Sequence, residues 1–251
     1  FFYAWLQSAM DNCQSSNMSI ADDVANDVQL AILDNWDRRD GVVVPDTSSV
    51  KFRGGGVDLE AVFLYSDLAD STSMAMWNQY TTARVCKAFL SSSTRLIRHH
   101  GGAVRSFDGD RVMGVFVGSS KNTSAVKCAL RINWMFNHLL RPKFEAAYEE
   151  FRNGKFSLRH CSGVDRSMTI AVRAGIRDND DIIWVGRAAN IAAKLSAIRD
   201  TPYHSFISGD VFDAMTDEAK TWRDGQAMWE ERSWTQGPVK RIFRSSWWWS
   251  P

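Results

Sequence analysis

The chain has 251 residues, of which 45% are hydrophobic and 24% are charged, and its formal net charge is +1. These values are typical of a globular protein with one decorated domain or two small ones. The balanced charge argues against a broad nucleic-acid-binding surface, and no apolar stretch approaches the roughly 18–20 residues that span a bilayer. We therefore expect a protein that binds neither nucleic acid nor a membrane.

The cysteines and a tryptophan-rich segment both have a plain structural interpretation. The four cysteines are far apart and show no C-x-x-C spacing: Cys13, Cys86, Cys128 and Cys161. Isolated cysteines of this kind are typical of reduced proteins, which predicts a cytoplasmic location. Residues 247–249 are three tryptophans, and we expect this tail to pack on the domain, with an exposed partner-binding tail as the alternative.

Residues 1–58 are predicted to be an N-terminal helical segment and a linker, and residues 59–251 to be the main domain. Ser19 begins a sequence that resembles a capping box, after which apolar residues recur at a helical period as far as Trp36. This helix could pack on the main domain or on a second subunit. Residues 45–58 contain a proline and three consecutive glycines, which indicate the linker.

The pattern of the main domain predicts a sheet with helices. In chain order we expect a strand at 60–66, a helix at 73–99, a hairpin at 103–107 and 111–117, a helix at 121–140, an irregular insertion at 141–166, strands at 168–174 and 181–185, a helix at 187–198, a strand at 204–208, a helix near 209–220, and strands at 227–234 and 239–246. The order β-α-β-β-α-β predicts an α+β fold, namely a ferredoxin-like βαββαβ domain with appended C-terminal strands and an N-terminal helix.

Two aspartates occupy positions suited to binding divalent ions. Asp67 ends the first apolar strand, and Asp110 follows the Asp108-Gly109 turn of the hairpin. In a ferredoxin-like sheet these two positions are neighbours, because the first strand lies beside the central hairpin. Two carboxylates and a backbone carbonyl, which we assign to Leu68, suit Mn²⁺ or Mg²⁺. We therefore predict a site for two such ions.

Residues 68–72 join the first strand to the following helix. The N-terminus of a helix offers unpaired backbone N–H groups and the positive end of the helix dipole. Asp70, Ser71 and Thr72 are therefore candidates for the segment that receives the β- and γ-phosphates of a nucleotide.

Asn190 and Lys194 lie four residues apart on the predicted helix 187–198. The apolar residues of that helix define a buried stripe on its other side, so both polar side chains should point away from the core of their own subunit. An amide and a cation in this arrangement can hold a charged transition state, which suggests a site shared between two subunits.

Together these motifs resemble the class III nucleotidyl cyclase domain, the family of adenylate and guanylate cyclases, over residues 59–220. In this resemblance Asp67 and Asp110 match the two metal-binding aspartates, and Asn190 matches the asparagine that orients the ribose. Lys194 stands where the family has its transition-state arginine, so the charge is kept and the bidentate fork is lost. The resemblance implies a homodimer that acts on a nucleoside triphosphate.

The departures from the family concern the base and the triphosphate. Ser106 and Ile183 occupy the positions that read the purine, and they match neither the adenylate nor the guanylate cyclase pattern. Tyr65 stands where phenylalanine is usual in the first aspartate motif. The V-K-G segment of many cyclases is missing, and Lys240 is only a vague substitute for its lysine.

Residues 178–190 are most similar to the stand-alone bacterial cyclases of the Pycsar antiphage system, which make cyclic UMP or cyclic CMP. This likeness favours UTP, with CTP possible, and it implies a phage-derived signal and a separate effector that binds the cyclic nucleotide. A pyrimidine pocket needs extra bulk, which Tyr65 and Trp184 could provide, and a hydrogen bond from Ser106 or Arg105.

Three other interpretations remain open from the sequence. The chain could be an ordinary purine cyclase with an unusual base pocket. It could be a catalytically inactive module that binds a nucleotide, which Lys194 and the missing V-K-G segment favour and the two aspartates disfavour. It could also be an assembly protein held together by its N-terminal helix and its tryptophan tail.

Overall fold

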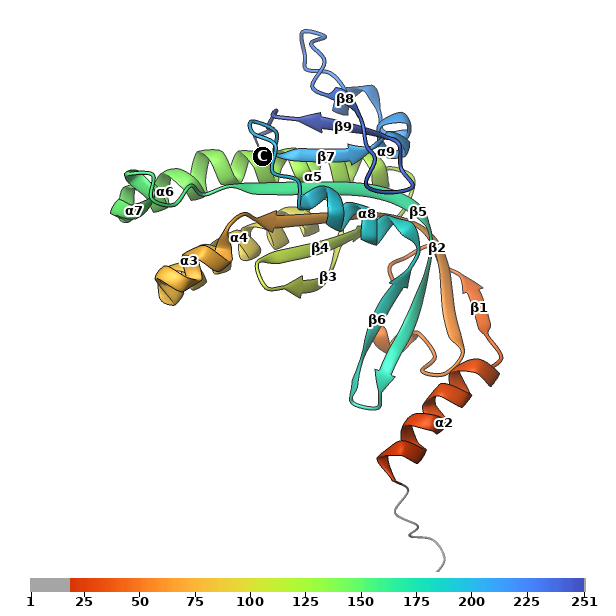
Figure 1. The fold of residues 1–251 in the computed structure, drawn as a ribbon. Helices are drawn as coiled ribbons and strands as arrows, with labels where there is room; N and C mark the ends of the chain where they lie inside the picture. The colour runs from red at the N-terminus through yellow and green to blue at the C-terminus, as the bar shows by residue number, and fades with distance from the viewer. Residues whose placement is uncertain (1–18, 251) are drawn as a thin grey trace, which may run out of the picture.

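A computed structural model describes residues 19–250, which form a nine-stranded sheet with helices against both faces (Figure 1). The strands are β1 (Asp37–Asp40), β2 (Gly55–Leu68), β3 (Ala103–Asp108), β4 (Arg111–Phe116), β5 (His160–Ile176), β6 (Asn179–Val185), β7 (Ser205–Ser208), β8 (Glu230–Ser233) and β9 (Arg241–Ser245). The helices are α2 (Ile20–Leu33), α3 (Ser71–Trp77), α4 (Gln79–His99), α5 (Lys121–Met135), α6 (Arg141–Ala147), α7 (Glu149–Arg152), α8 (Arg187–Ser196) and α9 (Gly209–Ala214). The shorter helical segments are η1 (Thr47–Ser49), the π-helical η2 (Phe136–Leu140) and η3 (Asp217–Ala219).

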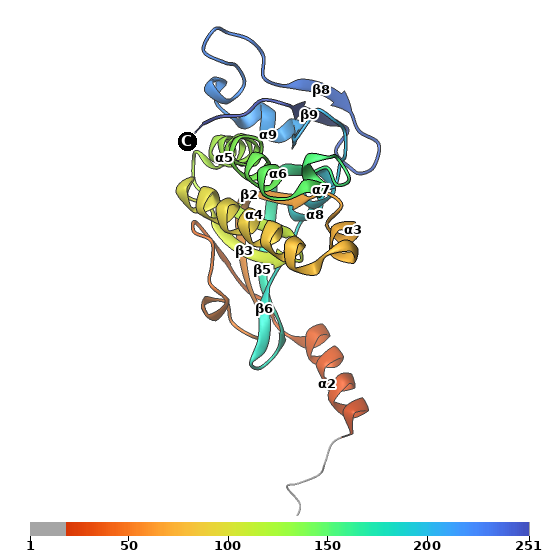
Figure 2. The same cartoon turned by 90° about the vertical axis from the view of Figure 1, so that its left-hand side faces the viewer.

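The central strands have the ferredoxin-like order. The sheet runs β3-β4-β2-β5-β7-β9-β8, with β1 attached to β2 and β6 attached to β5. Strand β2 lies between β4 and β5 and is antiparallel to both, as in a βαββαβ unit. Helices α4 and α5 cover one face, and α8 crosses the other (Figures 1 and 2). The predicted α+β class with appended C-terminal strands and an N-terminal helix is confirmed.

Strand β2 is buried on both faces, which explains its nearly continuous apolar sequence. Val62 and Leu64 belong to the core beneath α4 and α5. Ala61 and Phe63 point the other way, toward α8. Because side chains alternate along a strand, Asp67 shares its face with Phe63 and lies on the side of α8. The same alternation therefore decides which face of the sheet carries the candidate site.

The N-terminal helix forms as predicted but ends early. The side chain of Ser19 accepts a hydrogen bond from the Asp22 N–H, and the Asp22 carboxylate accepts one from the Ser19 N–H, so the capping box is present. Helix α2 ends at Leu33, before Trp36, and it has no buried residue. It stands away from the rest of the domain at the start of β2 (Figures 1 and 2).

The predicted linker at 45–58 is wrong over half of its length, because half of this segment lies in regular secondary structure. It contains η1 and the first residues of β2, which pair in parallel with β1. The glycines serve close approach rather than flexibility: Gly54 has φ of +62°, and a Cβ there would lie 2.5 Å from the carbonyl oxygen of Asn35. The division of the chain near residue 59 stays a prediction.

The predicted helix 73–99 is divided at Asn78. Its side-chain oxygen accepts a hydrogen bond from the Thr81 N–H at 2.9 Å, so Asn78 ends α3 and caps α4. The apolar periodicity continues across the break, which is why the sequence pattern predicts one helix.

The predicted insertion at 141–166 is also wrong. Helix α5 continues through η2 into α6, the short helix α7 follows after a break at Tyr148, and β5 begins at His160, eight residues before the predicted strand at 168–174. The first half of β5 contains the polar residues His160, Ser162 and Asp165, all of them buried. These residues conceal a central strand from an analysis that relies on apolar patterning. The other elements lie within a few residues of their predicted bounds.

The tryptophan tail packs on the domain, as expected. The backbone N–H of Trp249 donates to the carbonyl of Leu130 on α5 at 3.2 Å, and the side chain of Asn133 donates to the carbonyl of Trp247 at 2.8 Å. Cys86, Cys128 and Cys161 are free thiols, and Cys13 lies outside the described residues. Within residues 19–250, no helix has the length and apolar character required to cross a bilayer.

Acid should destabilise the domain through the buried His160. Burial, reinforced by the nearby His204, holds the pKa of His160 well below its ordinary value. The unfolded chain takes up this proton below about pH 6.5 whereas the folded chain does not, so the free energy of unfolding falls as the pH drops from about 7 to 5. Urea unfolding at both pH values measures this loss. His160→Gln should weaken the pH dependence and His99→Gln, at an exposed position, should not; equal dependence in all three proteins would contradict the assignment.

Candidate active site

The structure brings the two predicted metal-binding aspartates together. Asp67 is the penultimate residue of β2, and its register partner on β4 is Arg111, the residue that directly follows Asp110. The Asp67 side chain is only 14% exposed. Burial raises the pKa of Asp67 and the neighbouring charge of Asp110 raises it further, while Arg199 acts in the opposite direction. Two carboxylates that repel each other at a strand end form an attractive location for a divalent cation.

A cation of the chain already occupies this location. Nη2 of Arg199 lies 2.8 Å from Oδ2 of Asp67 and 3.4 Å from the carbonyl oxygen of Leu68. Within residues 19–250 no three His, Cys, Asp or Glu side chains gather around one point, and the oxygens that meet at Arg199 are one from the Asp67 carboxylate and the Leu68 carbonyl. Because a positive group contacts both the carboxylate and the carbonyl, these oxygens can attract a cation, and oxygen donors are the kind that hard divalent ions prefer.

Arg199 was not found from the sequence. It follows the C-terminus of α8, where the helix dipole favours a cation, and Nη1 donates to the carbonyl of Ser196 at 2.7 Å. That signal could have placed the arginine at the helix end. Its contact with Asp67 joins residues 132 positions apart and depends on the tertiary fold.

The predicted phosphate-binding segment follows directly after the aspartate. Asp70 has a left-handed backbone with φ of 61° and precedes Ser71 and Thr72, which begin α3. The Asp70 carboxylate pairs with Nη2 of Arg159 at 2.6 Å. Arg159 is a cation that the sequence analysis missed, and it adds positive charge beside the candidate phosphate seat.

Asn190 and Lys194 are exposed on α8, as the helical pattern predicts. Within the described residues, no hydrogen bond or ion pair connects either side chain with Asp67 or Asp110. Gly163 on β5 lets α8 pack closely on the sheet, because a Cβ there would lie 2.2 Å from the Ala192 carbonyl oxygen. Helix α8 therefore packs closely on the sheet, and its polar face, which carries Asn190 and Lys194, is exposed.

The first turn of α8 is fixed by charged groups. Nε of Arg187 lies 3.3 Å from Oδ2 of Asp165, a fully buried carboxylate on β5, and its Nη2 pairs with Asp210. Burial raises the pKa of Asp165, while the nearby Ser208 side chain and the charge of Arg187 lower it. Arg187 thus anchors the turn that precedes Asn190.

Three of the predicted base-contacting residues share one face of the sheet. Tyr65 is the register partner of Met113 across β2 and β4, and Met113 is the register partner of Ser106 across β4 and β3. The side chains of Tyr65 and Ser106 therefore point to the same face as that of Met113. Trp184 lies on that side too, with its ring 5.3 Å from the ring of Phe63 at 74°. Burial raises the pKa of the Tyr65 hydroxyl, and the charge of Arg111 lowers it to a smaller extent.

The other two predicted base-contacting residues, Arg105 and Ile183, do not join this group. Arg105 pairs with Asp46 at 3.0 Å, which binds it to the segment before η1. Ile183 is 49% exposed and directly precedes Trp184 on β6, so the two side chains point to opposite faces. Within one chain, Ile183 therefore lies on the face opposite to Tyr65, and the guanidinium of Arg105 is held by Asp46 and the Val44 carbonyl.

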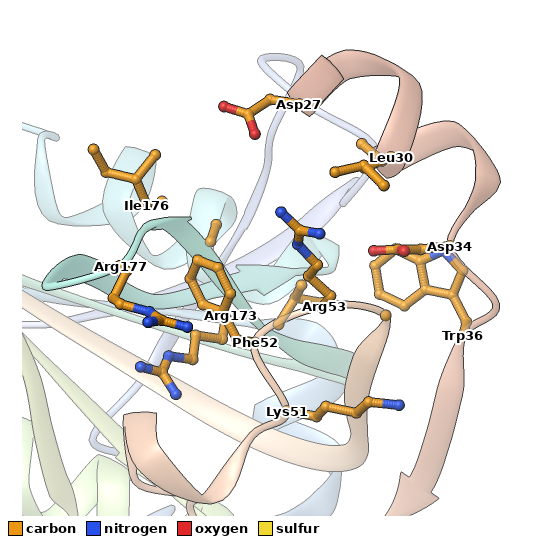
Figure 3. Close-up of a pocket in the computed structure, with 15 residues that line it drawn as sticks. Asp27, Leu30, Asp34, Trp36, Lys51, Phe52, Arg53, Arg173, Ile176 and Arg177 are labelled. Carbon is orange, nitrogen blue, oxygen red and sulfur yellow. The ribbon is translucent and has the colours of Figure 1, made fainter. Parts of the chain in front are cut away.

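A large cavity lies apart from the aspartates. It has a volume of about 920 Å³ and lies between α2, residues 51–54 and the end of β5 (Figure 3). Its basic side chains include Arg53, Arg173 and Arg177. None of the residues predicted to bind metal or nucleotide lines it, so the size of this cavity does not mark the candidate active site.

Comparison with solved structures defines the class of protein. The chain superposes on the guanylyl cyclase Cya2 with a TM-score of 0.62 at 20% identity, covering 78% of this chain and 96% of that one. This is a likeness of fold, and the fold is that of a nucleotidyl cyclase domain. No protein-family model matches the chain.

Curated relatives give the family. The chain is 42% identical to a uridylate cyclase of Rhodovulum sp. over 237 residues, which is 93% of this chain and 99% of that protein. It is 36% identical to a uridylate cyclase of Xanthomonas perforans over 217 residues, or 86% and 91% of the two chains. The chain belongs to the family of these proteins, within the class III nucleotidyl cyclases. The resemblance found in the sequence is confirmed.

Proposed function

We propose that the protein is a uridylate cyclase that converts UTP into 3′,5′-cyclic UMP and pyrophosphate. The observation that carries this proposal is the pair of carboxylates, Asp67 and Asp110, at the end of β2 and at the start of β4. The chain that carries them is 42% identical to a uridylate cyclase. The retention of both carboxylates favours an active enzyme over an inactive nucleotide-binding module. CTP is the second candidate, because Tyr65, Ser106 and Trp184 do not separate the two pyrimidines.

Asp67, Asp110 and the carbonyl of Leu68 would hold two Mn²⁺ or Mg²⁺ ions. Bound there, the ions would supply a lowered pKa for the ribose 3′-hydroxyl and charge compensation for the triphosphate. The N–H groups at Asp70, Ser71 and Thr72, supported by the charge of Arg159, would receive the β- and γ-phosphates.

The second half of the site would come from a second copy of the chain. Asn190 and Lys194 are exposed and make no contact with the aspartates of their own chain within the described residues, so we place them across a two-fold interface. Asn190 of the partner would orient the ribose, and Lys194 of the partner would neutralise charge that develops on the α-phosphate.

The reaction is an in-line displacement. The ribose 3′-oxygen forms a bond to the α-phosphorus, the bond from that phosphorus to the oxygen bridging to the β-phosphate breaks, and pyrophosphate leaves with the electron pair. The 3′-hydroxyl proton is released to solvent. The protein supplies position and charge and forms no covalent intermediate.

Incubation of the purified protein with ATP, GTP, CTP or UTP and Mn²⁺, followed by mass spectrometry, tests the function. Cyclic UMP and pyrophosphate are the expected products. Cyclic CMP would keep the pyrimidine assignment and change the base, whereas a cyclic purine would keep the chemistry and remove the pyrimidine assignment. If no nucleotide reacts, the inactive binding module becomes the better description.

Tyr65 should contribute to the choice of base. Its ring shares a face with Ser106 and Trp184, so Tyr65→Ala removes bulk that limits the pocket to a smaller base. We expect the ratio of kcat/KM for UTP to that for ATP to fall by roughly tenfold, the effect of one well-packed contact. Tyr65→Phe keeps the ring and should keep the ratio. An unchanged ratio in Tyr65→Ala would remove Tyr65 from the base pocket.

We also propose that the cyclic nucleotide serves as a second messenger in antiphage defence in the cytoplasm. The product differs from UTP by a closed phosphodiester ring, so a separate effector with a pocket for that ring would have to read it. Infection of cells that carry the gene alone, the effector alone or both tests this role: protection should require both.

A further inference from the structure

One arginine contacts two of the oxygens that we assign to metal binding, one from Asp67 and one from Leu68. Nη2 of Arg199 is 2.8 Å from Oδ2 of Asp67 and 3.4 Å from the carbonyl oxygen of Leu68. The Arg199 side chain is 30% exposed and the Asp67 side chain 14% exposed, so water screens this contact only partly. We propose that Arg199 is an internal counter-ion that closes the metal site of the nucleotide-free protein and competes with divalent ions for Asp67. The inference rests on the metal site of the proposed function.

The competition follows from the shared oxygens. A divalent ion held by Asp67 and Leu68 would use the same two oxygens that Nη2 of Arg199 now contacts. The nitrogen that now contacts both oxygens occupies the same space, and its charge repels a second cation. Binding of the ion therefore requires the guanidinium to leave Asp67. The free energy lost with the Asp67–Arg199 contact makes the binding free energy of the ion less favourable by the same amount.

Arg199 has a second attachment that remains when the first is broken. Nη1 donates to the carbonyl of Ser196 at 2.7 Å and to that of Ile198 at 3.2 Å. These carbonyls lie at and just beyond the C-terminus of α8, where the helix dipole attracts a cation. The guanidinium can therefore release Asp67 while one half stays bound, so the displacement is local and reversible.

Manganese binding by the nucleotide-free protein provides the test, because free Mn²⁺ has an electron paramagnetic resonance signal that disappears on binding. The titration is run at about pH 8, where the carboxylates of all variants are ionised. We expect Arg199→Gln to bind Mn²⁺ roughly fivefold more tightly than the wild type, the size of a partly exposed, charge-assisted contact. Arg199→Lys keeps the charge but cannot span Asp67 and the α8 carbonyls, so its affinity should lie between the two.

Arg111→Gln is the matched control. Arg111 also lowers the pKa of Asp67 by its charge, but its guanidinium pairs with Asp108 at 2.8 Å and not with Asp67. Its variant should bind Mn²⁺ within about twofold of the wild type, because the lost charge makes no ion pair with Asp67 and is screened by solvent. Equal gains in Arg111→Gln and Arg199→Gln would indicate general electrostatics and overturn the proposal.

Asp67→Asn separates this inference from the proposed function. Loss of Mn²⁺ binding in Asp67→Asn together with unchanged binding in Arg199→Gln and Arg199→Lys would retain the metal site and overturn the role of Arg199. Undiminished binding in Asp67→Asn would overturn both. If Arg199→Gln does not fold, as judged by circular dichroism, Arg199→Lys decides alone: affinity no higher than that of the wild type contradicts the proposal.

Discussion

Asp67→Asn is expected to lower kcat/KM for UTP by roughly a thousandfold, which corresponds to about 4 kcal/mol of lost transition-state stabilisation. The amide keeps the shape of the side chain and can still contact Arg199, but it removes the negative charge that a divalent ion needs. Asp110→Asn should have a similar effect, because its carboxylate completes the same site. Initial rates with Mn²⁺ and with Mg²⁺ measure both losses.

The neighbouring Asp108 supplies a control for this prediction. Its side chain is 73% exposed and pairs with Arg111 in the same hairpin, yet it is not among the proposed ligands. Asp108→Asn should keep at least about half of the wild-type rate, because an exposed ion pair contributes little. Appreciable turnover by either Asp67→Asn or Asp110→Asn with either metal would refute the metal assignment.

Two inactive variants should restore each other when they are produced together. Asp67→Asn disables one side of the proposed interface, and the double variant Asn190→Ala, Lys194→Ala disables the other. In a mixed dimer one of the two sites is intact, so an equal random mixture should recover about a quarter of the wild-type activity. Assays of the co-expressed proteins, against each variant alone, measure the recovery.

The control for restoration uses two defects on the same side. Asp67→Asn with Asp110→Asn leaves every site in a mixed dimer without one carboxylate, and no activity should return. If Asp67→Asn also fails to recover with the Asn190→Ala, Lys194→Ala partner, although mixed dimers form, then the site is not divided between two chains. Size-exclusion chromatography of differently tagged copies verifies that they form.

Short sequence motifs predict the turns and helix starts that depend only on neighbouring residues. The hairpin of β3 and β4 was predicted from the Asp108-Gly109 turn, and the capping box of α2 from Ser19 and Asp22. The start of β5 was missed because its buried residues are polar and are satisfied by distant partners. Ser162, for example, bonds the Ser66 hydroxyl on β2 at 2.9 Å, and nothing near Ser162 in the sequence indicates that partner.

In the candidate site, too, some features can be predicted from the sequence and others depend on contacts between distant residues. Asp67 and Asp110 could be paired from the sequence, because the order of elements alone makes their strands neighbours. The ion pair between Arg105 and Asp46 could not be foreseen, because it joins residues 59 positions apart. The opposite orientations of Ile183 and Trp184 follow from the alternation of side chains along the predicted strand 181–185. Arg199 could not be foreseen because its contact depends on where α8 ends above the sheet.

Strand β2 is one unbroken strand that runs from the end of the domain beside α2 to the candidate active site. It runs for 14 residues from the glycines beside α2 to Leu68, a length of about 45 Å at the usual rise of a strand. Its pairing with β5 continues from Gly56 to Leu68 without a shift of register. The end of the molecule that carries α2 and the end that carries Asp67 are therefore joined by one continuous pair of strands, with no loop between them.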